Sequence, residues 1–220
     1  MPTVDVYYHF LPPDDVVSAR HFADLAEGLR ERGWKVRVFA SNRSCRANGA
    51  SYPLEETLKG ILYHRTWRPD FPQNRAYGRV ANALWMCASW TLGAIWEQNP
   101  PDIMITGTDP IFSVASSLAW KATFPSTKLV HWCFDLYPDA LFAEGIVREN
   151  SLPGRALKSL AALTLQSQDM LANLGPCMAK RLGDHAPLAE QIELTPWALV
   201  EPESLPCLLY TSDAADDTPC

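Results

Sequence analysis

Short apolar stretches alternate with amphipathic stretches along most of the chain. Residues 4–11 are rich in β-branched and aromatic side chains and stop at a pair of prolines, which is typical of a buried strand that ends in a loop. Residues 18–32 then place apolar side chains at helical spacing, and Gly33 follows as a common residue after a helix. Residues 34–40 repeat the strand pattern. The three segments predict a β-α-β unit, whose two strands must run parallel.

The alternation continues far along the chain, with no visible internal repeat. Residues 41–60 are polar and contain glycine and proline, which favours a long loop or a short excursion. Further strands are expected at 61–65, 102–106, 128–134 and 192–195, and further helices at 77–97, 111–123 and 154–172. The sequence therefore predicts an α/β fold, a Rossmann-like doubly wound parallel sheet.

Composition and charge narrow the class of protein. The 220 residues are 47% hydrophobic and 20% charged, which is ordinary globular composition and enough for one sizeable core. A formal net charge of -6 argues against a surface that coats phosphates, so no nucleic-acid partner is expected. The six cysteines include no CxxC pair, so neither a zinc site nor a secreted disulfide framework is indicated, and no metal is expected.

The first residues lack the basic and long apolar regions of a secretory signal, so a cytoplasmic protein is expected. Residues 83–96 are nearly all apolar, but about fourteen residues are fewer than the roughly 20 that cross a bilayer. A helix buried against the sheet is the favoured interpretation. The alternative is a peripheral contact of its tryptophans with the inner face of a membrane.

Residues 207–220, CLLYTSDAADDTPC, break abruptly with the pattern before them. Their first ten residues match one reading frame of a common transposase-based sequencing adapter, so we interpret this tail as non-native, adapter-derived sequence. A genuine disordered terminus is the alternative. The folded domain is then expected to comprise residues 1–206.

Ligands of open α/β sheets bind beyond the carboxyl ends of the strands, so the loops after the predicted strands are the candidate sites. The first loop, residues 11–18, leads into a helix whose first N–H groups could approach a phosphate. Its Asp14, Asp15 and Ser18 could equally cap that helix. The loop lacks the GxGxxG pattern, which argues against a dinucleotide cofactor.

Two later loops carry further polar side chains. Residues 106–110 turn sharply out of a buried strand. Residues 131–139 combine an imidazole, two carboxylates and aromatic rings, a mixture that suits a sugar because rings stack on its faces and carboxylates accept from its hydroxyls. We interpret Asp135 and His131 as candidate catalytic residues, with Asp135 able to deprotonate an acceptor hydroxyl. The alternatives are a helix-capping aspartate and a core histidine.

The segment YYHFLPPDDVVSARHFADLAEGLRERGWKVRVFASNRS, with HWCFDLYPDALFAEG and IELTPWALVEP downstream, resembles the N-terminal domain of family 4 glycosyltransferases of the bacterial polysaccharide type. The resemblance covers residues 3–204. It implies the GT-B architecture of two facing Rossmann-like domains, of which this chain is the acceptor-side N-terminal half. It also implies metal-independent, cofactor-free transfer with retained anomeric configuration, from a nucleotide-sugar donor to a glycan or lipid-linked acceptor.

The resemblance also implies roles for particular positions. The acceptor is expected at Thr108, Asp109, Tyr137 and Asp139. Many relatives carry a Gly-Gly pair in the first loop where this chain has two valines. The loop expected to face the donor phosphates consists of Pro13, Asp14, Asp15, Val16, Val17 and Ser18.

The donor-binding C-terminal domain of the family is absent from this sequence, so we expect no turnover from the fragment alone. Two other functions stay open from the sequence. One is a stand-alone, non-catalytic α/β domain that binds a ligand or a partner. The other is half of a GT-B nucleotide-sugar epimerase, which would act on a free nucleotide-sugar without an acceptor.

Overall fold

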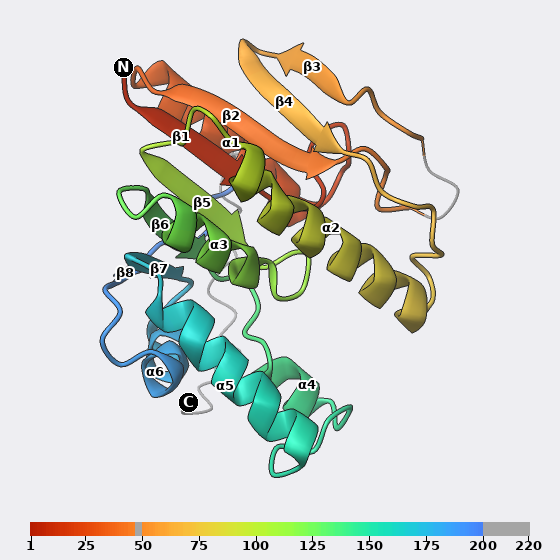
Figure 1. Ribbon diagram of the computed structural model, residues 1–220, viewed down its shortest axis with the longest axis vertical. Helices are drawn as coiled ribbons and strands as arrows, with labels where there is room; N and C mark the ends of the chain where they lie inside the picture. The colour runs from red at the N-terminus through yellow and green to blue at the C-terminus, as the bar shows by residue number, and fades with distance from the viewer. Residues whose placement is uncertain (47–49, 200–220) are drawn as a thin grey trace, which may run out of the picture.

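The computed structural model describes residues 1–46 and 50–199, and in this part of the chain one sheet of eight strands carries helices on both faces (Figure 1). The strands are β1 (Thr3–Tyr7), β2 (Lys35–Ser41), β3 (Glu55–Leu58), β4 (Ile61–Thr66), β5 (Ile103–Gly107), β6 (Lys128–Trp132), β7 (Met170–Asn173) and β8 (Gln191–Glu193). Their order across the sheet is β3-β4-β2-β1-β5-β6-β7-β8, and every described neighbouring pair is parallel except β3 with β4. The predicted α/β, Rossmann-like, doubly wound fold is confirmed.

The helices form a layer on each side of the sheet. Helix α1 lies behind the sheet in Figure 1, whereas α2, α3 and α5 lie in front of it. A short 3-10 turn (Ser113–Ala115) precedes α3. The helices are α1 (Val17–Glu31), α2 (Ala76–Trp96), α3 (Ser116–Thr123), α4 (Asp139–Ala143), α5 (Leu152–Gln166) and α6 (Pro176–His185).

Side-chain alternation along the strands supplies one apolar surface to each layer. Helix α1 buries Phe22 and Ala26 completely against Val4, Val6 and other residues of the first surface. The opposite surface receives α2 and α3, whose buried residues pack on the strands there. Residues of this second cluster are Tyr7, Met86, Trp90, Ala94, Met104, Trp120 and Leu129. Each surface is covered by helices whose apolar side chains recur at helical spacing. This spacing is visible in the sequence, which is why the sequence predicted the layers.

Two predictions of secondary structure were wrong. The expected loop 41–60 contains β3, which pairs with β4 through a tight turn at Lys59 and Gly60, both at positive φ. The expected helix 154–172 ends at Gln166, and Met170–Asn173 is strand β7 instead. Pairing of β7 with β6 and β8 outweighs the local helical pattern there.

Helices α4 and α6 were not predicted. The tail 207–220 and the domain boundary at residue 206 lie outside the described residues. Within the described part of the chain, no helix is long and apolar enough to cross a membrane. No group of three or more His, Cys, Asp or Glu side chains in that same part is placed to hold a metal ion.

Candidate functional site

The order of the strands locates a crevice between β1 and β5. The chain leaves β1 through α1 to reach β2 on one side, and β5 joins β1 from the other side. Such a reversal of direction opens a space beyond the carboxyl ends of the two strands, and ligands of open α/β sheets bind there. The residues that follow β1, β5 and β6 are therefore the ones that a ligand would meet.

His9 follows β1 and is held between the neighbours of that strand. Its backbone N–H donates to the carbonyl oxygen of Asp109 at 2.9 Å, and its own carbonyl oxygen accepts from the N–H of Ser41 at 2.8 Å. The side chain is 3% exposed and stacks on Phe10 with ring centroids 3.9 Å apart. The backbone of β1, β2 and the loop after β5 thus fixes the position of this imidazole.

The imidazole of His9 contacts one carboxylate of the crevice. Its Nδ1 lies 3.4 Å from Oδ1 of Asp109, whose side chain is 39% exposed. Its Nε2 is buried, with no hydrogen-bond partner among residues 1–46 and 50–199. Leaving a buried polar atom unpaired costs stability, and His9 Nε2 is one of seven such side-chain atoms among the described residues. His9 was not selected from the sequence, and it orients Asp109.

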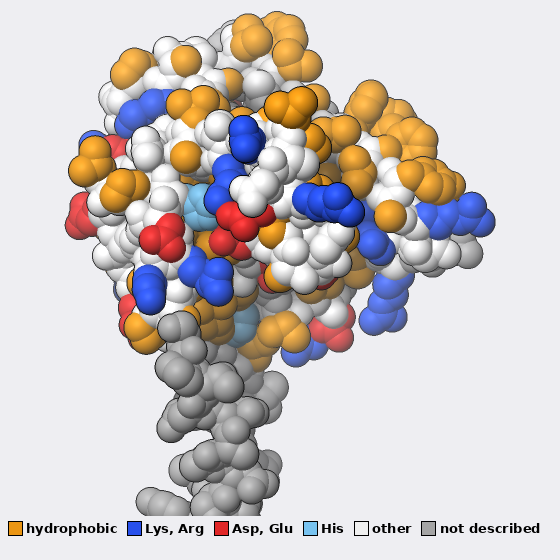
Figure 2. Space-filling model, turned by 90° about the horizontal axis from the view of Figure 1, so that it is seen from below, with side chains coloured by type: hydrophobic (Ala, Val, Ile, Leu, Met, Phe, Trp, Pro, Cys, Tyr) orange, Lys and Arg blue, Asp and Glu red, His pale blue; other side chains and the backbone are white. Residues whose placement is uncertain are grey.

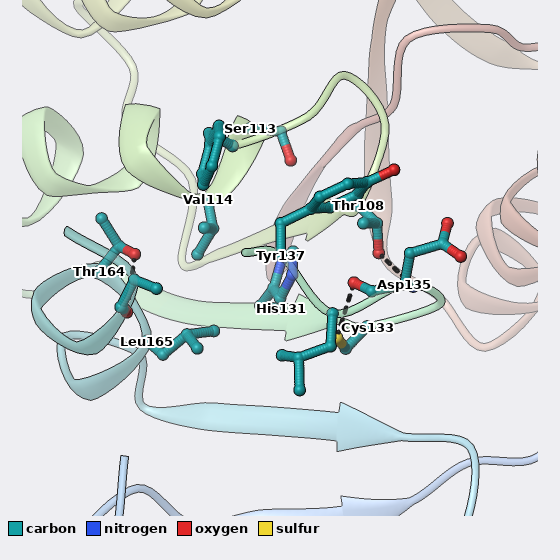
Figure 3. Close-up of a pocket in the computed structure, with 12 residues that line it drawn as sticks. Thr108, Ser113, Val114, His131, Cys133, Asp135, Tyr137, Thr164 and Leu165 are labelled. Atoms are coloured by element: carbon teal, nitrogen blue, oxygen red, sulfur yellow. Dashed lines mark hydrogen bonds between the residues drawn. The ribbon is translucent and has the colours of Figure 1, made fainter. Parts of the chain in front are cut away.

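Thr108 joins the loop after β5 to the loop after β6. Its hydroxyl oxygen accepts from the N–H of Phe134 at 2.8 Å and from the N–H of Asp135 at 3.2 Å. This places Asp135 near Asp109, and burial followed by the negative charge of Asp109 raises the pKa of Asp135. No described residue hydrogen-bonds to the carboxylate of Asp135, which points away from His131 in Figure 3. The carboxylate is therefore free to meet a ligand.

An aromatic ring stands beside the two carboxylates. Tyr137 packs against Phe112 with ring centroids 6.1 Å apart. Burial raises the pKa of its hydroxyl, and the charges of Asp135 and Asp109 raise it further. The structure therefore brings together Asp109, Asp135 and Tyr137 from the predicted residues, and adds His9. Two carboxylates and a ring form a surface that suits a sugar.

His131 lies in the core under this surface. It is 3% exposed, and its Nδ1 is 2.9 Å from the hydroxyl oxygen of Thr106 on β5. Burial lowers the pKa of its imidazole to about 4, so the ring is neutral at neutral pH. With Thr108, Asp135 and Tyr137 it lines a small pocket, drawn in Figure 3.

This pocket is too small for a sugar. The space open to the centre of a water molecule is only about 20 Å³, so the pocket holds about one water molecule. A sugar ring would have to bind outside its mouth, against Asp109, Asp135 and Tyr137. The described residues thus form one wall of a site rather than an enclosed cavity.

Asp139 lies elsewhere. It begins α4, and its Oδ2 is 2.6 Å from Nε2 of His185 on α6, with Arg181 3.7 Å away. Burial raises the pKa of Asp139, but the hydrogen bond and charge of His185 outweigh burial and lower it. The carboxylate of Asp139 is therefore paired with α6, unlike that of Asp135, and it ties α4 to α6.

Two aspartates of the first loop serve the fold. Asp14 is 7% exposed, and its carboxylate accepts from the hydroxyls of Ser44 at 2.7 Å and Tyr52 at 3.1 Å. It thereby anchors the segment that follows β2. Asp15 forms an ion pair with Arg20 on the surface of α1.

The start of α1 has no side-chain cap. Val16 occupies the cap position, and Ser18 instead accepts a hydrogen bond from the Tyr8 hydroxyl at 2.6 Å. Pro13 precedes them after a cis peptide bond, and Val17 is 67% exposed. Neither aspartate nor Ser18 caps the helix, so the positive end of the α1 dipole is left to attract an anion.

Comparisons with known proteins show the family and the fold of this chain. A family model described as a glycosyl transferase 4-like domain matches residues 18–197. The catalytic domain of starch synthase IV from Arabidopsis thaliana, bound to ADP and acarbose, has a similar structure, with a TM-score of 0.58 and 12% identity. The match covers 89% of this chain and 51% of that chain, so this chain spans about half the length of the starch synthase structure.

A sucrose-phosphate synthase from Thermosynechococcus elongatus has a TM-score of 0.55 and 14% identity, over 90% of this chain and 90% of that chain. No curated protein sequence matches this chain. Identities this low show a shared fold, and the match over residues 18–197 adds the family.

Proposed function

The chain belongs to the glycosyl transferase 4-like family, and on that premise we propose that it is the acceptor-side domain of a retaining glycosyltransferase of the GT-B type. The parent enzyme moves a sugar from a nucleotide-sugar to a hydroxyl of a glycan or lipid-linked acceptor, as in polysaccharide biosynthesis. The observation that carries the proposal is the group of Asp109, Asp135 and His9 at the carboxyl ends of β1, β5 and β6.

The acceptor side of the reaction follows from these side chains. Asp135 takes the proton of the acceptor hydroxyl, and its raised pKa makes it a better base than an ordinary carboxylate. Asp109, oriented by His9, accepts a hydrogen bond from a second hydroxyl, and Tyr137 packs on the sugar face. The acceptor oxygen then bonds to the anomeric carbon on the face from which the donor phosphate leaves, so the anomeric configuration is kept as that carbon's bond to the phosphate breaks. We propose that this transfer uses no metal or organic cofactor.

The donor side is supported by two observations. The starch synthase structure holds ADP, which favours a nucleoside diphosphate as the leaving group of a related fold. In this chain the uncapped start of α1 follows β1 directly, and its N–H groups would attract the donor phosphates. Pro13, Val16 and Val17 would line the path of the donor phosphates to the helix. Asp14 and Asp15 would not contact the phosphates and would contribute only by holding the loop in place.

The proposal includes a second domain. The wall formed by Asp109, Asp135 and Tyr137 is open, and the adjoining pocket of about 20 Å³ cannot enclose a sugar. Transfer requires donor and acceptor to be held together, so a donor-binding domain must face this wall. We therefore expect residues 1–206 to lack turnover by themselves. We also expect the complete enzyme to work on the cytoplasmic side of a membrane.

The test is to recover the encoding gene from its source DNA by long-read sequencing, express its product, and assay a panel of nucleotide-sugars with and without glycan acceptors. Nucleotide release that requires an acceptor, with the donor's anomeric configuration kept in the product, supports the proposal. Conversion of the nucleotide-sugar without acceptor would favour an epimerase. A gene that ends in CLLYTSDAADDTPC and a product without turnover would favour a stand-alone binding domain.

A further inference from the structure

Helix α2 exposes a long apolar stripe. It has 21 residues, so it is about 31 Å long, and its opposite face packs Met86 and Trp90 into the core. The stripe follows helical spacing along the outer face. Its members, each between 47% and 70% exposed, are Tyr77, Val80, Leu84, Leu92, Ile95 and Trp96. An exposed apolar surface of this extent marks a contact with another apolar phase.

Aromatic residues widen the stripe near the start of α2. Trp67 and Trp85 pack edge to face with ring centroids 5.4 Å apart, and the indole N–H of Trp85 donates to the carbonyl oxygen of Trp67 at 2.8 Å. Trp67 and Phe71 are 53% and 41% exposed. A Cβ on Gly78 would stand 2.1 Å from the carbonyl oxygen of Pro72, so the segment before α2 is pressed against the helix. The aromatic cluster is therefore fixed beside the stripe.

The charges around the stripe are positive. Arg75 precedes α2. Arg79, the single charged residue of the helix, shares its helical spacing with the buried Met86 and Trp90, so it lies on the face opposite the stripe. A pocket of about 420 Å³ beside the start of α2 is lined by Arg46, Arg68 and Arg75 together with Phe71 and Tyr77. Figure 2 shows hydrophobic side chains gathered with Lys and Arg side chains at the right of the view, the side on which Figure 1 draws the start of α2.

Nearby acidic groups are already paired. Asp70 lines the same pocket and lies 3.3 Å from Arg43. Glu97, after the end of α2, lies 3.4 Å from Arg37. The stripe and its surroundings thus combine apolar and aromatic side chains with an excess of arginine, which complements the phosphates and acyl chains of an anionic membrane.

We propose that α2 docks on an anionic lipid bilayer, lying in its plane with the stripe in the acyl boundary and Arg75 and Arg46 on lipid phosphates. Tryptophan and tyrosine prefer this interfacial depth. The helix does not cross the bilayer, because no described helix is long and apolar enough to do so. Helix α2 carries no acidic residue that an anionic surface would repel.

Docking would place the candidate site next to the membrane. Cys87 of α2 donates from its thiol to the carbonyl oxygen of Ile111 at 3.7 Å, in the segment that follows β5, and the charge of Arg79 opposes the effect of burial on the pKa of the Tyr137 hydroxyl. The start of α2 and the acceptor wall therefore adjoin one another. This step rests on the proposed function and narrows its acceptor to a lipid-linked glycan, whereas the docking itself does not depend on any transfer reaction.

The experiment is co-sedimentation of the whole 220-residue chain with vesicles, without any nucleotide-sugar. The chain is expected to bind vesicles that contain phosphatidylglycerol and phosphatidylcholine in similar amounts, to bind pure phosphatidylcholine far more weakly, and to dissociate as salt is added. The double variant Leu84→Glu/Ile95→Glu should lose at least tenfold in affinity. Arg75→Ala should lose about fivefold, from roughly 1 kcal/mol per arginine at an anionic surface.

The matched control is Leu163→Glu on α5, since Leu163 is 60% exposed and Leu84 is 66% exposed. It should bind vesicles as the unchanged chain does, with the far-ultraviolet circular dichroism of all variants unchanged. Equal vesicle binding by the α2 double variant and the control would overturn the proposal. So would light scattering that shows a dimer broken by the double variant, with no vesicle binding in either protein. Because no donor is present, neither result bears on sugar transfer.

Discussion

His9 and His131 both lie near the carboxyl ends of strands, yet their surroundings give them different roles. His131 bonds to Thr106 inside the core, and burial lowers its pKa to about 4. His9 meets Asp109, which is 100 positions away in the chain. The sequence drew attention to His131 because its motif is local. It could not identify His9, because the contact with Asp109 depends on β1 and β5 being neighbours.

The lowered pKa of His131 makes a prediction about stability and pH. In the unfolded chain the imidazole titrates near 6.5, so between pH 6.5 and about 4 the unfolded state binds the extra proton. The stability due to neutral His131 is present above pH 6.5 and is lost as the pH falls toward 4. When the pH falls from 7 to 4.5, the free energy of unfolding measured with urea should drop by up to about 3 kcal/mol more in the unchanged chain than in His131→Gln.

The control for this experiment is His64→Gln, because His64 is partly exposed. It should keep the pH dependence of the unchanged chain. Parallel stability curves for His131→Gln and the unchanged chain would show that His131 is not a buried neutral group.

Thr108→Val tests the link between the loops after β5 and β6. The change removes the oxygen that accepts from the N–H groups of Phe134 and Asp135, so unfolding free energy should fall by roughly 1–3 kcal/mol. Thr91→Val is the matched control, because the Thr91 hydroxyl donates only to Cys87 within α2. A similar loss in both variants, measured by urea unfolding, would argue that Thr108 has no special place in the site.

At the scale of elements, hydrophobic periodicity predicted the helices and strands whose formation depends on local sequence. The buried faces of α1 and α2 and the central strands repeat at the spacing of their own structure, so their positions were foreseen. Strand β7 was not, because its pairing with β6 is a contact between distant residues that overrides helix propensity. Strand β3 depends on Lys59 at positive φ, where asparagine or glycine is the usual turn signal.

Gly107 controls how closely α1 approaches the end of β5. A Cβ there would stand 2.4 Å from the Tyr8 ring and 2.5 Å from the Phe22 ring, so Gly107→Ala should cost roughly 1–3 kcal/mol of stability or more. Gly93→Ala is the opposite case: nothing lies within 4 Å of that Cβ, and alanine favours a helix, so the variant should gain about 0.5–1 kcal/mol. Thermal unfolding that ranks the two variants in the reverse order would contradict this packing.

At the scale of the whole molecule, the strand order decides where chemistry can occur. The crevice between β1 and β5 gathers side chains from three loops that the sequence places far apart, and its open shape fits the facing domain that we propose. Sequence analysis foresaw the sheet. It also selected Asp109, Asp135 and Tyr137, which the structure places near one another, since residues after buried strands are recognisable. It also assigned Asp139 to this group, whereas the structure pairs Asp139 with His185.

The most direct test of the account is the turnover of the complete enzyme with Asp135→Asn. Sugar transfer should fall by about 10²–10⁴-fold, with folding unchanged, because the proton acceptor is lost. Asp169→Asn is the control, since Asp169 lies before β7 at the opposite end of the sheet and bonds to Lys121 and Lys128. It should keep the turnover of the folded enzyme. Transfer by Asp135→Asn at the rate of the unchanged enzyme would contradict the assignment of the acceptor site to this wall.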